Sequence, residues 1–451
     1  MKPISRILFM LTLALLVWGL PKAGYAEVVV VGQYDTSDEL MDGFVFDCFP
    51  SNRNEPRKYR IAVADLLPIA DSPDRLSAVI PEQLRDNFSL SGFFEPLDKR
   101  TFLEKTPEAG VVVGSHPEYP AWTQIGADFL IKGQIETSPS KLTLELRLFD
   151  VVLGKQMIGK RYVGRPDEAR KLASRFTNDV LEAVIGTPGV FGSEIIFVSG
   201  SPDRKQIYKT ALGSDEVVAI TNDKANRPNT HPTVGPGGSV AWVRRIENTK
   251  NWELVSDDQV VYSGDLHLSP TFKPDGSLVA ALSGPQKTAI FDFSVNPPKL
   301  LIDLGGINVS PTFSPDGSRM AFVSDKEKVP SIYLAPASGE GEVTRLTNGA
   351  KATDPAWSPT GEYIAFVTRE TDICIIRPDG TGFRQLTGGR GANMRPGFSP
   401  DGRMIVFSSN RNGRQQLFVM SLNGDNQRPL LPDYREPQEQ PCWSPVWPDN
   451  K

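Results

Sequence analysis

Carboxylates recur at regular positions in the second half of the chain, and paired carboxylates can carry general acid–base chemistry. Asp275, Asp316 and Asp401 each follow a proline, precede a glycine and stand before an apolar run. In such a sequence the proline presets φ within a β-turn, the aspartate can hydrogen-bond its own backbone, and the glycine tolerates a positive φ. We therefore interpret these carboxylates as turn residues and not as catalytic groups.

Other catalytic constellations are missing from the sequence. It has no Gly-x-Ser-x-Gly nucleophile elbow, no His-Glu-x-x-His motif and no Cys/His spacing typical of a metal site. We predict no catalytic residue, no metal and no cofactor. Cys48, Cys374 and Cys442 are an odd set without Cys-x-x-Cys spacing, and the repeats described below place Cys442 on an inner strand and Cys374 on an outer strand of another blade, too distant to bridge. We expect free, mostly buried thiols.

The aspartate turns belong to a stretch that recurs six times. The copies are PTVGPGGSVAWV from Pro232, PTFKPDGSLVAAL from Pro270, PTFSPDGSRMAFV from Pro311, PAWSPTGEYIAFV from Pro355, PGFSPDGRMIVFS from Pro396 and PCWSP from Pro441. Successive prolines are about 38 to 45 residues apart, which is within the range for four-stranded propeller blades. A sandwich or a β-solenoid would also repeat turns and strands, but four strands per repeat favour a propeller.

The last copy holds only the first strand of a blade. The stretches EIIFVSG, QIYKTAL and EVVAIT, just before the first full repeat, read as a second, third and fourth strand that lack a first. We predict that the C-terminal strand completes this blade and closes a six-bladed β-propeller over residues 190–451. Trp242, Trp357 and Trp443 are then expected to pack in the core between blades.

The chain before the propeller divides into three parts. In residues 1–26, Lys2 and Arg6 precede an apolar run that is shorter than a membrane span, and small residues stand at the end, which is typical of a cleaved signal peptide. Residues 27–58 form an N-terminal arm. Residues 59–186 are expected to form an α/β domain with buried strands such as LTLELRLFDV and two amphipathic helices, of which the second ends at Gly186.

The charge of the chain limits its partners. Removing Lys2, Arg6 and Lys22 with the signal peptide takes the formal net charge from −5 to about −8. No basic field remains to hold nucleic acid or anionic lipid, so we expect protein partners.

The innermost strands of the propeller suggest where a partner docks. The loops that lead into these strands gather around one mouth of the central channel. The residues there, each just before a repeat proline, are His231, Ser269, Ser310, Asp354, Arg395 and Gln440. They are polar and differ from blade to blade, whereas the turn residues repeat. Solvated loops would show the same diversity, and we take the six residues as the candidate partner-binding site.

Two stretches of the first domain resemble the TolB family. They are PEQLRDNFSLSGFFEPLDKRTFL and AWTQIGADFLIKGQIE, and they stand ahead of a six-bladed propeller that ends in CWSP. Such blades occur in many propellers, including those of some peptidases, whereas the domain order and GADFLIKGQI are much more specific. The resemblance covers nearly the whole mature chain.

The resemblance implies a soluble periplasmic protein of the Tol-Pal system. Such a protein binds the lipoprotein Pal and the inner-membrane-anchored protein TolA, and the system keeps the outer membrane intact and draws it inward at division. The Pal site of the family lies near the channel, and the TolA site lies at the mature N-terminus. The matching residues for TolA are Glu27, Val28, Val29, Val30 and Val31. The longer arm over residues 27–58 departs from the family, since only EVVVV resembles its start.

The alternative function is a periplasmic carbohydrate-binding or hydrolytic propeller, because unrelated functions share this fold. The missing catalytic motifs weigh against hydrolysis, and binding to purified glycan would distinguish a carbohydrate-binding protein from a protein scaffold.

Overall fold

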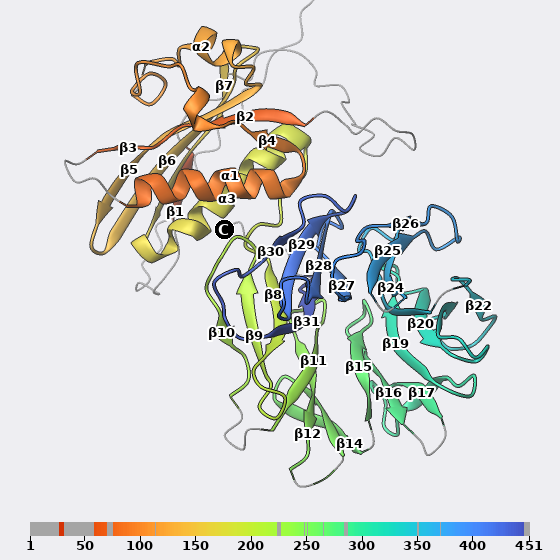
Figure 1. The fold of residues 1–451 in the computed structure, drawn as a ribbon. Coiled ribbons are helices and arrows are strands. Elements are labelled where there is room, and N and C mark those ends of the chain that lie inside the picture. The colour runs from red at the N-terminus through yellow and green to blue at the C-terminus, as the bar shows by residue number, and fades with distance from the viewer. Residues whose placement is uncertain are drawn as a thin grey trace, which may run out of the picture.

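The computed structural model describes residues 27–30 and 58–445, apart from residues 70–74, 113, 223–226, 248, 250, 265, 284–286, 350 and 370. Of residues 27–30 and 266–268 it describes only the backbone. An α/β domain is followed by a β-propeller (Figure 1). The predicted signal peptide, residues 31–57 of the predicted arm and Cys48 lie outside the described residues. None of the helices in the described part is long and apolar enough to span a membrane.

One mixed sheet forms the centre of the α/β domain. Its strands are β1 (Glu27–Val30), β2 (Tyr59–Val63), β3 (Leu67–Pro68), β4 (Phe94–Pro96), β5 (Phe129–Ser138), β6 (Lys141–Asp150) and β7 (Lys155–Gly164). They lie in the order β1-β7-β6-β5-β2-β4, with β3 paired to β5. β2 runs parallel to β4 and β5, whereas β5, β6, β7 and β1 pair antiparallel. The alternating leucines of β6 are fully buried, as the sequence pattern predicts.

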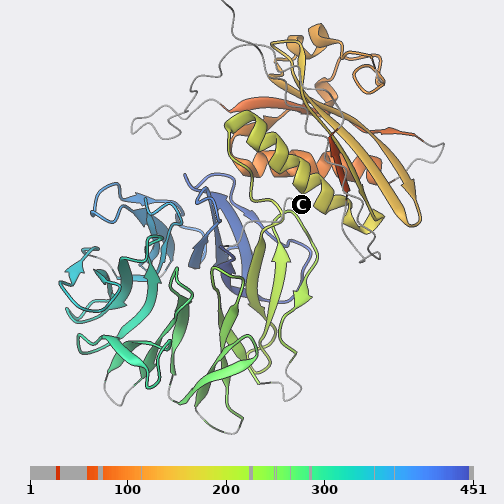
Figure 2. The same cartoon turned by 180° about the vertical axis from the view of Figure 1, so that it is seen from behind.

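Two long helices cover the sheet face that is turned toward the propeller (Figures 1 and 2). The helices of the domain are α1 (Leu76–Ser91), η1 (Lys99–Thr101), α2 (Tyr119–Gln124), η2 (Pro166–Glu168) and α3 (Ala169–Ile185). Phe88 of α1 and Phe176 of α3 are fully buried in the shared core. α3 ends at Gly186, whose φ of 74° lies in the left-handed region that glycine tolerates, so the chain can turn toward the propeller.

Parts of this domain differ from the sequence expectation. The apolar pattern of YRIAVADLL predicts one buried strand over residues 59–67, but the structure has β2 over Tyr59–Val63 and the short β3 over Leu67–Pro68. The sequence pattern also does not indicate β7, because Gly159 and several polar residues interrupt its alternation, nor α2, which is only six residues long. α2 packs Trp122 against Leu130 and Phe149 on the sheet face opposite α1 and α3.

Six four-stranded antiparallel sheets form the propeller. From the innermost strand outward, the first three blades are β31 (Gln438–Trp443), β8 (Glu194–Ser199), β9 (Gln206–Ala211) and β10 (Val218–Ala219); β11 (Asn229–Val234), β12 (Val240–Arg245), β13 (Trp252–Ser256) and β14 (Gln259–Gly264); β15 (Leu266–Phe272), β16 (Leu278–Ser283), β17 (Thr288–Asp292) and β18 (Lys299–Ile302). The next three blades are β19 (Asn308–Phe313), β20 (Arg319–Ser324), β21 (Ser331–Pro336) and β22 (Thr344–Arg345); β23 (Ala352–Trp357), β24 (Ile364–Thr368), β25 (Asp372–Ile376) and β26 (Arg384–Gln385); β27 (Asn393–Phe398), β28 (Met404–Ser409), β29 (Gln416–Ser421) and β30 (Arg428–Pro429). We number them blades 1 to 6.

Both ends of the propeller meet in blade 1, as the split repeat predicts. β31 pairs antiparallel with β8, for example Cys442 with Ile196. The indole Nε1 of Trp443 donates to Oγ of Ser193 at 2.8 Å, across 250 positions of the chain. Closure leaves no open edge between the first and last blades. Trp242, Trp357 and Trp443 are all buried, which confirms their predicted packing role.

The α/β domain contacts the propeller at the turns of blade 6. Nδ2 of Asn426, in the turn between β29 and β30, donates to the carbonyl of Ser89 at 3.0 Å. The guanidinium of Arg403, in the turn between β27 and β28, lies 5.0 Å from the ring centre of Phe93. Both turns lie at the end of the blade where the innermost strand finishes. The opposite end, where the innermost strands begin, is therefore directed away from this contact.

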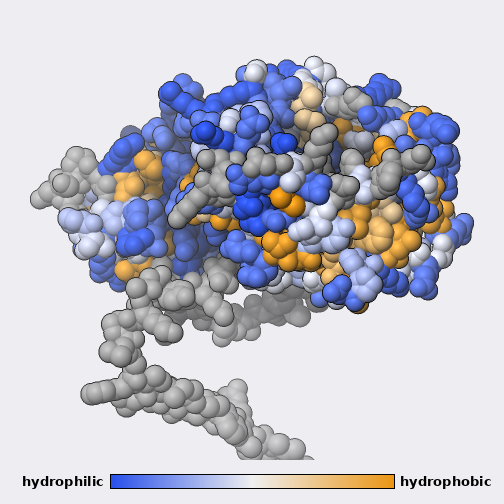
Figure 3. Space-filling view, turned by 90° about the horizontal axis from the view of Figure 1, so that it is seen from below, coloured by the Kyte–Doolittle hydropathy of each residue, from blue (hydrophilic) through white to orange (hydrophobic). Residues whose placement is uncertain are grey.

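Polar residues dominate the face seen from below, and hydrophobic ones lie in separate patches among them (Figure 3). Exposed hydrophobic side chains of the propeller include Val260 and Val261 on β14 and Leu300 on β18. These two strands are the outermost of their blades, so these three residues lie far from the central channel.

Candidate functional site at the mouth of the propeller channel

Six equivalent residues stand within the innermost strands, two or three positions after each strand begins and directly before its repeat proline, and not in the loops that the sequence pattern indicated. All six have a left-handed backbone: φ is 54° at His231, 124° at Ser269, 54° at Ser310, 51° at Asp354, 54° at Arg395 and 50° at Gln440. A non-glycine residue in this region carries a strain of about 1 to 2 kcal/mol. The structure thus imposes a positive φ on all six positions, with values of 50° to 54° at five of them and 124° at Ser269.

A β-bulge explains this conformation. The register of the innermost strand shifts across each of these positions, for example between Thr230 and Thr233 and between Met394 and Gly397. Proline has no N–H to donate to the ladder, and a bulge re-aims the neighbouring side chain. The repeat therefore fixes where the six side chains stand, while the type of residue can vary from blade to blade. We call these six residues the mouth ring.

Arg395 connects three blades of the mouth ring. Its Nη1 donates to Oγ of Ser269 at 3.3 Å, and its Nε lies 3.3 Å from Oδ1 of Asp354. Ser269 belongs to blade 3, which is opposite blade 6 in a ring of six, so the guanidinium reaches across the channel. The side chains of Arg395 and Asp354 are 31% and 18% exposed, so the ion pair is only partly shielded from solvent.

The other members of the mouth ring also contact one another. The hydroxyl oxygens of Ser269 and Ser310 are 3.2 Å apart. The backbone N–H of His231 donates to Oε1 of Gln440 at 2.8 Å, and Nε2 of Gln440 lies 3.4 Å from Nε2 of His231. The structure therefore brings together all six residues that the sequence proposed, in one group of four and one pair.

His231 is a buried member of the mouth ring, with 8% of its surface exposed. Burial lowers the pKa of His231 well below 6.5, and the positive charges of Arg395 and Lys205 lower it further. Nδ1 of His231 has no hydrogen-bond partner within the described residues. The imidazole is therefore neutral at neutral pH.

The mouth ring offers recognition chemistry. It combines hydroxyls, an amide, a neutral imidazole and one ion pair, all held by backbone that the repeat fixes. Hydrogen-bond donors and acceptors in fixed positions give specificity to a docked polar surface. Over the part of the chain that the structure describes, no three histidine, cysteine or acidic residues gather as a metal site would require.

The aspartates of the recurring turns lie at the opposite ends of the innermost strands. Oδ1 of Asp316 accepts from the N–H of Ser318 at 3.0 Å and from the hydroxyl of Ser314 at 2.5 Å. The bond from Ser314, followed by those from Ser318, lowers the pKa of Asp316 to about 2. Asp275 and Asp401 accept equivalent backbone bonds at 2.8 and 3.1 Å. These carboxylates are engaged within their own turns, as the sequence predicts.

The predicted TolA-binding residues lie in the α/β domain. Glu27–Val30 forms β1 at one edge of the sheet, in antiparallel register from Glu27 beside Val163 to Val30 beside Lys160 of β7. Val31 lies outside the described residues. The sequence alone places this segment as a separate arm, outside both cores. Backbone pairing instead makes its first residues an extension of the sheet.

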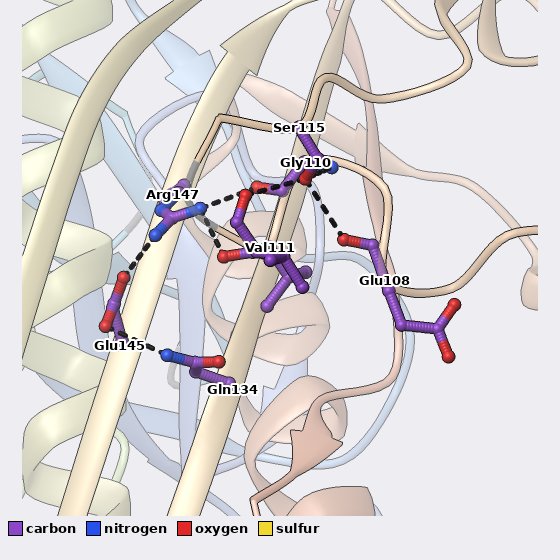
Figure 4. Close-up of polar contacts among 8 residues, drawn as sticks. Glu108, Gly110, Val111, Ser115, Gln134, Glu145 and Arg147 are labelled. Atoms are coloured by element: carbon purple, nitrogen blue, oxygen red, sulfur yellow. Dashed lines mark hydrogen bonds and ion pairs between the residues drawn. The ribbon is translucent and has the colours of Figure 1, made fainter.

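A polar cluster in the α/β domain was not indicated by the sequence pattern (Figure 4). Nη1 of Arg147 donates to the carbonyls of Gly110, at 2.9 Å, and Val111, and Nη2 donates to Glu145. Gln134 donates to the other oxygen of Glu145 at 3.1 Å. The cluster ties the loop before α2 to the face of β5 and β6.

A buried ion pair strengthens the same attachment. Lys132, directly opposite Arg147 in the sheet, pairs with Glu104, and the two side chains are only 2% and 5% exposed. The other oxygen of Glu104 accepts from the N–H of Glu118 at 3.0 Å. Charged residues that alternate along β5 and β6 suggest a solvated face, but the loop over residues 104–118 covers them. We interpret this cluster as structural.

The two cysteines within the described residues are free thiols. Burial raises the pKa of Cys374 to about 12 and that of Cys442 to about 11. Both thiols are therefore protonated at neutral pH and unsuited to nucleophilic chemistry.

Two family models match the chain. Residues 52–157 match the model described as the TolB amino-terminal domain, and residues 249–447 match the TolB beta propeller domain. The order of the two domains is the one that the sequence resemblance implied.

Curated relatives carry the same family name. A "Protein TolB homolog" from Chlorobium luteolum is 32% identical over 367 residues, which is 80% of this chain and 65% of the relative. A "Tol-Pal system protein TolB" from Desulfosudis oleivorans is 33% identical over 205 residues, covering 44% of this chain and 46% of the relative. The chain thus spans less than two thirds of the length of these relatives.

A solved structure shares the fold. The crystal structure of TolB from Acinetobacter baumannii superposes with a TM-score of 0.71 over 87% of this chain and 98% of that one, at 22% sequence identity. At this identity the match shows the fold alone. Because both TolB domain models match in the same order and curated TolB homologues align over most of the chain, the protein belongs to the TolB family.

Proposed function

We propose that this protein is a periplasmic component of the Tol-Pal system that acts by binding other proteins and not by catalysis. Its family and the printed name of its Desulfosudis oleivorans relative support the general role. In this proposal it docks a Pal-like outer-membrane lipoprotein and a TolA-like protein anchored in the inner membrane. It thereby helps to maintain the outer membrane and to draw it inward during cell division.

We place the Pal-like partner on the mouth ring. The observation that carries this choice is the hydrogen bond from Arg395 to Ser269 across the channel, together with the ion pair to Asp354. These contacts hold polar side chains from several blades in fixed positions before any partner arrives. Such preorganisation reduces the entropy that binding costs.

Charge on the mouth ring favours a polar and charged partner surface. The side chains of Arg395 and Asp354 are 31% and 18% exposed, so parts of both charged groups remain accessible to solvent. A docked partner can contact the remaining donors and acceptors of this pair. On the other side of the ring, His231 and Gln440 offer neutral hydrogen-bonding groups. The partner surface is therefore expected to present both charged and neutral polar groups.

We place the TolA-like partner on the N-terminal segment, residues Glu27 to Val31. β1 lies at the edge of the sheet, and an edge strand presents backbone N–H and C=O groups to a further strand. The α/β domain contacts blade 6 at its turns, on the side away from the mouth ring. The two proposed sites therefore lie on different domains, and both partners can bind at once.

The absence of catalysis and the location are part of the same proposal. The turn carboxylates, the most regular chemical groups of the chain, are engaged in their own turns. The predicted signal peptide over residues 1–26 supports export to the periplasm. A sensitive test of catalysis is hydrolysis of peptide, ester and glycan substrates by the purified protein, which we expect to stay at the rate without protein.

Hydrogen exchange tests the proposed docking face. The protein is mixed with the purified soluble domain of a Pal protein, and exchange is followed by mass spectrometry. We expect protection in peptides that contain His231 and Arg395 and unchanged exchange in peptides that contain the Asp316 turn. Protection that is confined to the turn peptides would place the partner on the opposite face and contradict the proposal.

A further inference from the structure

A pocket of about 220 Å³ lies between blades 5 and 6, outside the mouth ring. It is lined by Gly388, Arg390, Arg411 and Gln427. Gly388 and Arg390 belong to the loop that leads from β26 into β27, and Arg411 belongs to the loop between β28 and β29. Both loops lie at the end of the blades where the innermost strands begin. Gln427 comes from the turn between β29 and β30 at the opposite end of blade 6, so three of the four lining residues, but not all, come from the end where the innermost strands begin.

Neutral groups hold Arg411 in place. Its Nε donates to Oγ of Ser409 at 3.0 Å, its Nη1 to Oε1 of Gln427 at 2.6 Å and its Nη2 to Oδ1 of Asn393 at 2.6 Å. The guanidinium also lies 4.6 Å from the ring centre of Phe418. Arginine has five N–H groups, and three of them are used here. The side chain is thus fixed in orientation, with two donors left.

The positive charge of this pocket lacks a paired carboxylate. Within the described residues, neither Arg390 nor Arg411 forms an ion pair. Asp372 acts on Arg411 through its charge, but its carboxylate accepts hydrogen bonds from the hydroxyls of Thr387 and Thr371 instead. Burial, followed by the charge of Arg390, lowers the pKa of Arg411. A half-buried guanidinium beside a second one is a site where an anion is stabilising.

We propose that this pocket binds a carboxylate from an acidic side chain of the protein docked over the mouth ring, an inference that rests on the proposed function. The guanidinium fork suits a carboxylate because two parallel N–H groups can meet its two oxygens. Arg411 donates a hydrogen bond to Asn393, the first residue of β27. Arg395 of the mouth ring lies two positions after Asn393 on the same strand. One partner surface can therefore cover both places.

Gly388 provides a way to fill the pocket without altering its arginines. Its backbone is not left-handed, and a Cβ placed on it meets only Nε2 of Gln385, at 3.7 Å. A Cβ at this position therefore meets no clash, and Gly388→Leu introduces a side chain at the pocket wall. Gly237→Leu is the matched control, because Gly237 also tolerates a Cβ, with no atom within 4 Å, and lies in the turn between β11 and β12 at the opposite end of blade 2.

The first experiment tests the chemistry of the pocket without a partner. The side-chain Nε–Hε signal of Arg411 is followed by NMR while sodium acetate is added, with sodium chloride at equal ionic strength as the reference. We expect a saturable shift with acetate that is absent in Gly388→Leu. Equal, non-saturating shifts with both salts would overturn the carboxylate site.

The second experiment tests the source of the carboxylate. Binding of the purified soluble domain of Pal is measured by calorimetry, and we expect Gly388→Leu and Arg390→Gln each to weaken it about tenfold or more, with Gly237→Leu unchanged. Unchanged affinity in both pocket variants overturns the inference while the proposed function stands. No binding by the parent protein overturns the proposed function and the protein-borne carboxylate together, and the acetate titration then reports on the pocket alone.

Discussion

Arg395 on β27 donates a hydrogen bond from Nη1 to Oγ of Ser269 on β15 at 3.3 Å, although the two residues are 126 positions apart in the chain. The same guanidinium lies 3.3 Å from the carboxylate of Asp354 on β23. One side chain therefore links three of the six innermost strands. Together with Ser310, which contacts Ser269, these residues form one connected polar group of four within the mouth ring.

Replacing Arg395 removes this link. We expect Arg395→Gln to lower the free energy of unfolding by about 1 kcal/mol, because solvent already screens part of the ion pair with Asp354. Urea unfolding measures the change. The control is Arg377→Gln, which removes a more exposed ion pair with Glu362 at 3.9 Å, and we expect it to stay within about 0.5 kcal/mol of the parent. Equal losses in both variants would mean that the cross-channel contact adds nothing.

Closure of the ring depends on the C-terminal strand. Trp443 is 5% exposed, and its indole donates to Ser193 beside blade 1. We expect Trp443→Ala to destabilise the propeller by about 3 to 5 kcal/mol, because a large cavity remains and the hydrogen bond from the indole to Ser193 is lost. Trp252→Ala on β13 is the control with a half-buried side chain, for which we expect a smaller loss. Unchanged thermal unfolding of Trp443→Ala would reject the contribution of β31 to closure.

Burial of His231 predicts a pH dependence of stability. The unfolded chain binds a proton at this residue near pH 6.5, whereas folded His231, with its lowered pKa, binds one only well below that. Stability therefore falls as pH decreases from 6.5 toward the folded pKa, by up to about 1.4 kcal/mol per pH unit for one proton. Urea unfolding at several pH values measures this slope.

Two variants test whether His231 causes this pH dependence of the free energy of unfolding. His231→Gln should reduce the slope of the free energy of unfolding against pH between pH 7 and pH 5, by the contribution of roughly one bound proton. His116→Gln, at an exposed position of the α/β domain, should leave the slope as it is. If the two variants have the same slope, His231 is not held neutral by its surroundings.

The turn aspartates are predicted to stabilise turns. We expect Asp316→Ala to lower the free energy of unfolding, as measured by urea unfolding, through lost hydrogen bonds from Ser314 and Ser318. Blade 5 has Thr360 at the equivalent place, where its hydroxyl lies 3.0 Å from that of Ser358. Asp316→Thr should therefore cost less than Asp316→Ala, and a reversed order would contradict the turn interpretation.

The same carboxylate has a measurable acid titration. Its pKa is lowered to about 2 from an ordinary value of 3.8, so its contribution to stability is complete above pH 3.8 and is lost as pH falls through about 2. Carbon-detected NMR of the Asp316 carboxyl group should give a midpoint near that lower value. A midpoint near 3.8 would show that the turn bonds do not persist in solution.

The sequence predicts the blades well because the features that determine their strands are local and recur in each repeat. The proline, the turn and the apolar runs fix four strands per unit, and the truncated last copy indicates how the ring closes. The mouth ring follows from the same logic, since its residues are found by counting one position back from each repeat proline. Their left-handed backbone is a consequence of the shared bulge, which sequence patterns do not show.

Contacts between distant parts of the chain could not be predicted. Arg395 meets Ser269 only after ring closure places their blades opposite each other, and no local pattern encodes that contact. The buried polar contacts of Arg147 and Lys132 could not be predicted from the sequence for a related reason. Alternating charges suggest a solvated strand face, and only the fold shows that a loop covers it.

Calorimetry of a charge-reversed mouth ring tests the central claim most directly. The double change Asp354→Arg with Arg395→Asp keeps an ion pair within the protein but reverses the charges that a partner meets. We predict that it weakens binding of the soluble Pal domain by about tenfold or more, corresponding to the lower end of the effect of a mispaired charge at a partly exposed site. The matched control reverses Glu362 and Arg377 at the turn end of blade 5 and should bind as the parent does. Parent-like affinity in the Asp354 and Arg395 double variant would contradict the assignment of the mouth ring as the docking site.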